Sequence, residues 1–241
     1  MSNSKKVKIE FDQVTLWKAG TIIFAVLFII SIFTGGFSGS SSGSADGKVV
    51  VPPTQDPGQQ PLIKADVSIK GEPCFGDKNA EVLVVEFTDY QCPFCQRAYQ
   101  NTYPEIKKLV DKGDVRFCVK DYPLPFHEQA DEASIAANCA GEQDKYEEMH
   151  DKLFETMETW SGNADIKPVF VGYAKDLGLD EDDFSKCFDD PAQRKEVEGD
   201  VSEGSGAGVS GTPSFLINGQ LLVGAQPWSA FKTVIDAELS K

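Results

Sequence analysis

Two cysteines separated by two residues, Cys92-Pro93-Phe94-Cys95, follow a short apolar run at 82–87 and precede a pattern typical of a helix. Two sulfur atoms at this spacing can close a small disulfide. The unpaired N–H groups at the start of a helix favour the thiolate form of the first cysteine. Because a stabilised thiolate makes the disulfide easier to reduce, this order of strand, dithiol and helix predicts a centre that oxidises other thiols.

The same cysteine spacing occurs in structural zinc sites, which need a second close pair of ligands. No such pair is present, so we expect no metal and no other cofactor. A non-catalytic module whose cysteines are all structural or hold metal remains an alternative, and a metal assay with a thiol count would distinguish it from an enzyme. The remaining cysteines and the two histidines are solitary: Cys74, Cys118, Cys139, Cys187, His127 and His150.

Five ordered stretches carry a more specific signal: Val85–Cys95, Asp121–His127, Ala136–Ala140, His150–Phe154 and Gly211-Thr212-Pro213. Together they resemble the DsbA-like thiol:disulfide oxidoreductases of the thioredoxin superfamily, over about residues 71–239. The resemblance implies an α/β thioredoxin-like fold with a helical insertion at about 121–208. It also implies that the protein is an enzyme, a protein disulfide oxidoreductase that forms disulfide bonds in exported proteins.

The resemblance gives each residue of the dithiol motif a role. Cys92 is implied to be the sulfur that exchanges with substrates, exposed at the helix tip, and Cys95 the resolving partner one turn deeper. Pro93 and Phe94 are expected to contact the substrate. The strongest oxidants of this family carry a histidine at the position of Phe94, and phenylalanine donates no hydrogen bond to a thiolate. The net direction therefore stays open, with a disulfide isomerase or reductant as the alternative.

Three residues outside the motif are also implied to belong to the site. Pro213 is implied to be a cis-proline facing the dithiol, which leaves the Thr212 backbone extended to bind a peptide strand. Glu86 is implied to be the buried acid behind the dithiol, with a proton-transfer role. Two alternatives remain, namely that Pro213 is an ordinary trans turn proline and that Glu86 faces outward from its strand.

The other four cysteines are expected to form two structural disulfides. Cys139 and Cys187 sit at positions similar to those of the family, so we expect them to pair. By exclusion and by a shared core, Cys74 is expected to pair with Cys118. Each bridge would close a loop of roughly 45 residues, worth about 4 kcal/mol in the chain-entropy model. The alternative is that Cys74 and Cys118 form a second, exchangeable pair. Neither histidine is assigned chemistry.

The N-terminal region predicts where this chemistry takes place. No charged residue occurs from Ala19 to Ala45, and the apolar segment is long enough to span a bilayer. Four lysines lie before Ala19, so the N-terminus is expected in the cytoplasm and the rest outside. A signal peptide cleaved near Ser42–Ala45 is the alternative. We expect a cytoplasmic tail at 1–15, a single transmembrane anchor at 16–37, a flexible Gly/Ser/Pro linker at 38–61 and the catalytic domain at 62–241.

The expected partners follow from this location and from charge. The formal net charge of −15 argues against nucleic acid. Unfolded exported polypeptides with free thiols are the expected substrates. The resemblance implies reoxidation by a membrane quinone-linked partner of the DsbB or VKOR kind.

Local patterns predict the order of the elements. The order is strand, helix, strand, helical block, hairpin and helix, and its parallel first unit implies a central sheet with helices on both faces. Strands are expected at 67–69, 82–88, 115–119, 214–217 and 220–223, and helices at 94–112, 128–139, 143–159, 167–177, 180–188, 191–203 and 228–239.

Overall fold

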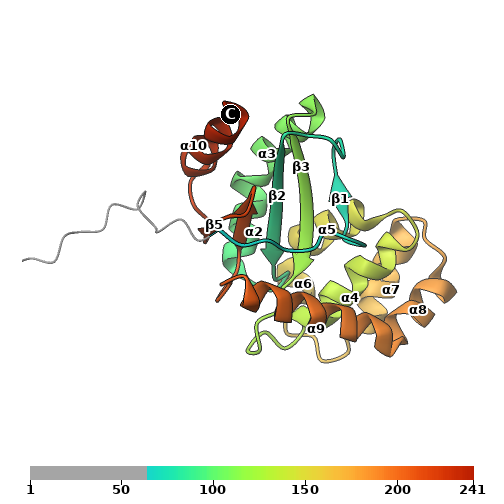
Figure 1. Cartoon of the computed structure of the whole chain (residues 1–241). Coiled ribbons are helices and arrows are strands. Elements are labelled where there is room, and N and C mark those ends of the chain that lie inside the picture. The colour runs from blue at the N-terminus through green and yellow to red at the C-terminus, as the bar shows by residue number, and fades with distance from the viewer. Residues whose placement is uncertain (1–63) are drawn as a thin grey trace, which may run out of the picture. The chain divides into compact units, whose positions relative to one another are not determined.

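The apolar segment 82–88 is the central strand of a five-stranded mixed sheet in the computed structural model, which describes residues 64–241 (Figure 1). The elements in chain order are β1 (Cys74–Phe75), β2 (Val82–Thr88), α2 (Pro93–Asn101), α3 (Tyr103–Lys112), β3 (Val115–Asp121), α4 (Ala130–Gly141), α5 (Tyr146–Glu155), α6 (Met157–Trp160), α7 (Lys167–Asp176), α8 (Glu181–Asp189), α9 (Pro191–Gly206), β4 (Ser214–Ile217), β5 (Gln220–Val223) and α10 (Trp228–Leu239).

The sheet has the strand order β1-β3-β2-β4-β5. Strands β2 and β3 are parallel, and the other neighbouring pairs are antiparallel. Alternation along β2 sends Val82 and Val84 into the larger core cluster and Val85 and Phe87 into a second cluster on the other face. The expected thioredoxin-like sheet with helices on both faces is therefore confirmed.

The two faces are covered by different helices. Helices α2, α3 and α10 contribute Ala98, Ile106 and Phe231 to the larger cluster, while α9 crosses the other face near the ends of the strands (Figure 1). This close approach of α9 requires a glycine. A Cβ atom at Gly204 would lie 2.7 Å from the ring of Phe87. The absence of a side chain there lets the helix pack directly on the sheet.

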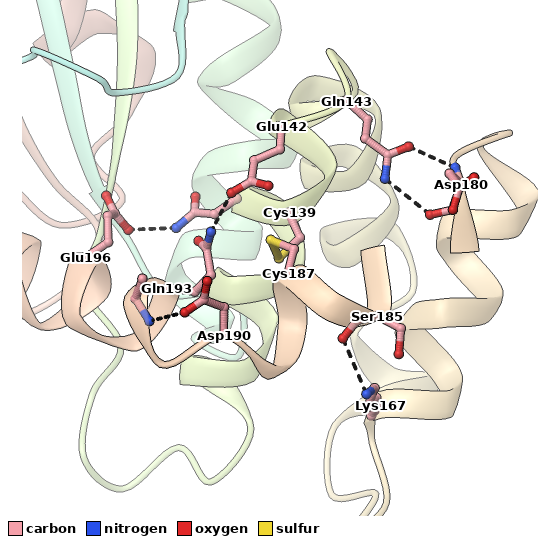
Figure 2. Close-up of a disulfide and its surroundings, with 12 residues drawn as sticks. Cys139, Glu142, Gln143, Lys167, Asp180, Ser185, Cys187, Asp190, Gln193 and Glu196 are labelled. Carbon is pink, nitrogen blue, oxygen red and sulfur yellow. Dashed lines mark hydrogen bonds between the residues drawn. A yellow bond between two sulfur atoms is a disulfide. The ribbon is translucent and has the colours of Figure 1, made fainter. Parts of the chain in front are cut away.

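The expected helical insertion is present as α4 to α9, between β3 and β4. Helix α4 lies at its centre, with most of its residues buried, and packs against α5, α7, α8 and α9. A disulfide between Cys139 on α4 and Cys187 on α8 crosses this bundle (Figure 2). Around it, Gln143 exchanges two hydrogen bonds with the backbone of Asp180, and Gln193 donates to Glu142 at 2.6 Å. Helices that are distant in sequence are thus held by both covalent and polar contacts.

The sequence predicts two helices that are each broken in the structure. The segment 94–112 divides at Thr102 into α2 and α3, because the ring and missing N–H of Pro104 do not allow one continuous helix. The segment 143–159 divides at Thr156, whose hydroxyl donates to the Lys152 carbonyl four residues earlier. The remaining predicted helices agree with the structure to within three residues.

The strand predicted at 67–69 is wrong. The Ser68 N–H donates to the carboxylate of Glu203 on α9, so it is not available to a neighbouring strand. This segment instead covers the second core cluster with side chains. Before this segment, Lys64 forms an isolated β-bridge with Gln220, at the start of β5. The strand that the sequence analysis missed is β1, where Cys74 pairs with Cys118 of β3 and forms a disulfide with it.

The expected cytoplasmic tail, transmembrane anchor and linker lie outside the described residues. Among residues 64–241, no helix combines the length and apolar character that crossing a membrane requires.

Candidate active site

The two cysteines of the motif lie where the central strand gives way to a helix. Cys92 is the residue before the first turn of α2, and Pro93 opens that helix. Both Cys92 and Cys95 are free thiols. The expectation that Cys92 is exposed is wrong, because only 3% of it is accessible. Its Sγ lies 3.5 Å from the Thr212 carbonyl oxygen, so the loop before β4 covers it.

The two thiols differ strongly in acidity. A hydrogen bond from the Cys95 thiol, with further ones from the backbone N–H groups of Cys95 and Phe94, lowers the pKa of Cys92 to about 6, against the opposing effect of burial. Burial raises the pKa of Cys95 well above that of an ordinary thiol. At neutral pH, Cys92 therefore carries a negative charge while Cys95 keeps its proton.

This asymmetry predicts the pH profile of alkylation. The alkylation rate of Cys92 is expected to rise with a midpoint near pH 6, compared with about 8.5 for a free cysteine. Cys95 should remain unmodified in the folded protein. Iodoacetamide labelling of the reduced protein from pH 4 to 9, followed by mass mapping, measures both. Modification of Cys95 first, or a midpoint near that of a free thiol, would reverse the assigned order of the two sulfurs.

Glu86 lies in the middle of β2, between Val119 of β3 and Phe215 of β4. It is only 5% exposed and shares its side of the strand with Val84, which packs against the larger core cluster. Burial raises the pKa of this carboxyl to about 8. Its charge is one of the influences that raise the pKa of Cys95, and Cys95 belongs to the same core cluster as Val84. An outward orientation of Glu86 is therefore wrong.

The loop that covers Cys92 contains the Thr212–Pro213 peptide bond, which is cis. The Thr212 carbonyl faces the Cys92 sulfur. Two aromatic rings are exposed: Phe94, within the dithiol motif, at 51%, and Phe126, which packs against His127, at 71%. They are the only large apolar side chains of the described residues with such exposure. Arg97 lies over the Phe94 ring at 5.0 Å.

Asp89, for which the sequence predicts no role, organises the loop before the dithiol. Asp89 is fully buried. Its carboxylate accepts hydrogen bonds from the N–H groups of Gln91 and Leu124 and lies 2.7 Å from His127 Nδ1. Its carbonyl accepts from the Cys92 N–H. The sequence did carry a signal for this role. An aspartate at the start of a turn often accepts a hydrogen bond from the backbone N–H group two residues later.

The two histidines, to which the sequence assigns no chemistry, make structural contacts. His127 caps the loop through Asp89. His150 is buried in a cluster of aromatic rings from Tyr90, Tyr99, Tyr103, Tyr146 and Phe154.

A cluster of carboxylates lies apart from the dithiol, where α9 meets β3. Glu72 and Asp200 place carboxylate oxygens around the buried ammonium of Lys120, and Glu203 adds a third at 3.0 Å. Lys120 is therefore the cation that these acids bind, and we assign them a structural role.

Comparisons with known proteins identify relatives over this part of the chain. A family model described as thioredoxin matches residues 68–237. The chain is 28% identical over 187 residues to disulfide bond formation protein D of Bacillus subtilis, covering 73% of this chain and 81% of that protein. It is 34% identical over 148 residues to Na(+)/H(+) antiporter NhaA 1 of Salinispora arenicola, covering 60% of this chain. It spans only 21% of the length of that relative.

Solved structures agree with these sequence relatives. Oxidised BdbD from Bacillus subtilis superposes with a TM-score of 0.68 at 26% identity, covering 75% of this chain and 99% of that one. The α-DsbA1 protein of Wolbachia pipientis shares the fold, with a TM-score of 0.65 at 22% identity, over 72% of this chain and 94% of that one.

Proposed function

This chain belongs to the thioredoxin family, and from that membership we propose that it is a thiol:disulfide oxidoreductase working through Cys92 and Cys95. The single observation that carries this proposal is the opposite shift of the two thiol pKa values at the start of α2. A thiol that ionises near pH 6 is a good leaving group, so the disulfide formed from this pair accepts electrons readily. The similarity to a disulfide bond formation protein supports the direction of oxidation.

The reaction proceeds in two exchange steps. A substrate thiolate attacks Cys92 Sγ in the Cys92–Cys95 disulfide, which forms a mixed disulfide and releases Cys95 as a thiolate that takes up a proton. A second substrate thiolate then attacks the substrate sulfur of the mixed disulfide and releases the Cys92 thiolate. Two electrons have passed from two substrate thiols to the protein, and the substrate gains a disulfide.

We assign substrate binding to the surface around Cys92. The Thr212 backbone, next to Pro213, offers strand-like hydrogen bonds to an extended peptide beside the sulfur. Pro93 and the exposed ring of Phe94 provide apolar contact for the side chains of an unfolded polypeptide. This surface suits substrates whose apolar residues are not yet buried.

Glu86 is proposed as the group that exchanges a proton with Cys95. A carboxyl whose pKa lies near 8 can both donate and accept a proton at neutral pH. Its place on the side of β2 that faces the core cluster of Cys95 supports this role, because Cys95 must gain a proton in the first step and lose one during reoxidation.

Glu86→Gln is expected to slow exchange and to stabilise the fold at pH 7. The folded pKa of about 8 is raised above the ordinary value of 4.5, so the wild-type carboxyl contributes its full stability below pH 4.5 and loses it as the pH rises to 8. At pH 7 the variant should gain about 3 kcal/mol in the free energy of unfolding. At pH 5 the gain should be under about 1 kcal/mol. Urea unfolding at both pH values measures the difference.

An exposed glutamate provides the control for the Glu86→Gln variant, because the same substitution there removes a charge that is not buried. Glu81 is exposed just before β2, so Glu81→Gln should change neither stability nor exchange. A Glu86→Gln variant with wild-type kinetics would remove the proposed proton-transfer role, and an equal effect at both pH values would mean that Glu86 is ionised in the fold.

We further propose that residues 16–37 anchor the chain in the cell membrane, with the N-terminus in the cytoplasm and the catalytic domain outside. The uncharged apolar segment and the lysines before it support this topology. Exported polypeptides with free thiols are then the substrates, and a membrane quinone-linked partner of the DsbB or VKOR kind accepts the electrons. Protease added to intact spheroplasts should remove the domain and spare the N-terminal tail; a soluble, released protein would instead indicate signal cleavage.

The deciding experiment is oxidation of a reduced, unfolded polypeptide by the oxidised protein, together with the equilibrium of the dithiol against glutathione. An oxidant should transfer its disulfide in one turnover and hold an equilibrium more oxidising than the glutathione pool. The Phe94 position favours one competing function, disulfide isomerisation or reduction. That function requires the dithiol to remain mainly reduced under the same conditions.

A further inference from the structure

The side chain of Gln91, directly before Cys92, links the dithiol loop to the helical insertion. Its Nε2 donates to Gln129 Oε1 and to Ser161 Oγ, both at 2.8 Å. Its Oε1 accepts from the Gln129 backbone N–H at 2.9 Å. One amide thus reaches two segments that lie 38 and 70 residues further along the chain.

Gln129 completes this connection from the other side. It precedes the first turn of α4 and is 7% exposed. Its Oε1 also accepts from the Gly162 N–H at 2.9 Å, in the turn that follows α6. The two glutamine side chains therefore tie together the start of α4, the end of α6 and the residue before the reactive sulfur. Partly buried polar contacts that meet in this way favour one arrangement of the segments they join.

The backbone of the same loop is also held by the buried residue Asp89. Asp89 accepts from the N–H groups of both Gln91 and Cys92. The Cys92 carbonyl in turn accepts from the Gln96 N–H, which begins α2. Two side chains of this turn reach the insertion: the Tyr90 hydroxyl pairs with that of Tyr146 on α5 at 2.9 Å, and Gln91 makes the contacts described above. Of the two, Gln91 is the residue bonded directly to Cys92, so its contacts act next to the reactive sulfur.

We propose that Gln91 is a positioning residue for disulfide exchange: paired with Gln129, it fixes Cys92 over the first turn of α2 by fastening the preceding residue to the helical insertion. This inference rests on the proposed function, because it concerns the reactivity of Cys92. The Cys92 sulfur is stabilised by N–H groups of the first helical turn, and such bonds weaken when donor and acceptor lose alignment. Loosening the residue before Cys92 should therefore reduce the reactivity of its sulfur without removing any group that touches it.

The experiment compares two glutamines that both bridge to the insertion. Gln91→Ala removes the contacts described above, and Gln96→Ala removes a hydrogen bond from α2 to the Phe154 carbonyl at 2.9 Å. In Gln91→Ala, the alkylation rate of Cys92 at pH 6 should fall about three- to tenfold, the equivalent of one lost hydrogen bond, and its midpoint should move to higher pH. Gln96→Ala should stay within about twofold of wild type, because the Gln96 side chain bonds to Phe154 and to no residue of the 89–92 turn.

Gln129→Ala provides a second variant that lies far from the sulfur in sequence. It should shift the profile in the same direction but by less than Gln91→Ala, because the bonds of Gln91 to the Gln129 N–H and to Ser161 remain. The double variant should add nothing to the Gln91→Ala shift, because the Gln129 side chain acts on Cys92 through Gln91. Equal shifts in Gln91→Ala and Gln96→Ala would overturn the inference, as would additive effects of the Gln91 and Gln129 variants. Oxidation of a reduced polypeptide by the wild-type protein is measured alongside. Its absence would reject the proposed function, whereas a wild-type rate with an unshifted Gln91→Ala profile would reject the positioning role alone.

Discussion

Replacing Cys92 with serine is expected to abolish oxidation of substrate thiols, lowering the rate by at least about a thousandfold. The first step requires a disulfide at residue 92, and serine cannot form one. Cys95 is fully buried and its pKa is raised, so it cannot substitute as the reactive sulfur. The measurement is single-turnover oxidation of a reduced, unfolded polypeptide by each protein after treatment with oxidised glutathione.

Cys95→Ala should give the complementary result. Cys92 can still enter mixed disulfides, but no neighbouring thiol can release them, so covalent complexes with disulfide-bearing polypeptides should accumulate. They appear as high-mass bands on non-reducing gels and disappear with reductant. The same bands must be absent from a variant that also carries Cys92→Ser.

The matched control removes the other candidate redox pair. The double variant Cys74→Ala/Cys118→Ala eliminates the disulfide between β1 and β3 and leaves the dithiol intact. If that bridge is structural, exchange per folded molecule should stay at the wild-type rate. Activity that survives in Cys92→Ser and is lost in this double variant would make Cys74 and Cys118 the working pair.

Removing the disulfide in the helical insertion is expected to lower the stability of the fold by about 4 kcal/mol. Cys139 and Cys187 are 48 residues apart, and the bridge restricts the unfolded chain by closing that loop. For a domain of this size, the double variant Cys139→Ala/Cys187→Ala should melt about 8 to 16 °C lower. Thermal unfolding followed by circular dichroism measures the difference.

Strong reductant provides the control for lost packing. Wild type and the double variant both lack the bridge under those conditions, so their melting temperatures should converge. A difference that persists in reductant would assign the loss to the two missing sulfur atoms and not to the cross-link. The dithiol motif lies in another element, so the variant should still carry out exchange at temperatures where it is folded.

The fold was predictable where short-range patterns decide it. Strands β2, β4 and β5 follow directly from apolar runs and from the Asn218–Gly219 turn, where both residues adopt positive φ. The break at Thr102 also had a visible signal in Pro104, which the helical periodicity outweighed. Strand β1 had no visible signal in the sequence, because a strand of only two residues is too short to show an alternating pattern.

The candidate site, like the fold, was predictable from the sequence only in part. Cys92, Cys95 and the Thr212–Pro213 loop belong to recognisable motifs, and the structure brings the Thr212 carbonyl to the Cys92 sulfur. Asp89 and Gln91 lie within the same stretch, yet their importance depends on partners in the 122–127 loop, at Gln129 and at Ser161. Hydrogen bonds across such separations follow from the assembled fold, so a single sequence does not indicate them. The exposure of Cys92 was mispredicted for the same reason, since the residue that covers it comes from the loop before β4.

The bridge between Lys64 and Gln220 has a practical consequence. Ala65 donates to the Gly219 carbonyl, so the described chain begins at the turn between β4 and β5. That turn lies beside Leu83 at the start of β2, whereas the dithiol follows the other end of the strand, about 20 Å away. A resin or electrode joined directly to residue 64 would therefore attach at the end of the sheet remote from Cys92. A solid-phase thiol oxidant made in this way keeps the end of the sheet that carries the dithiol away from the support.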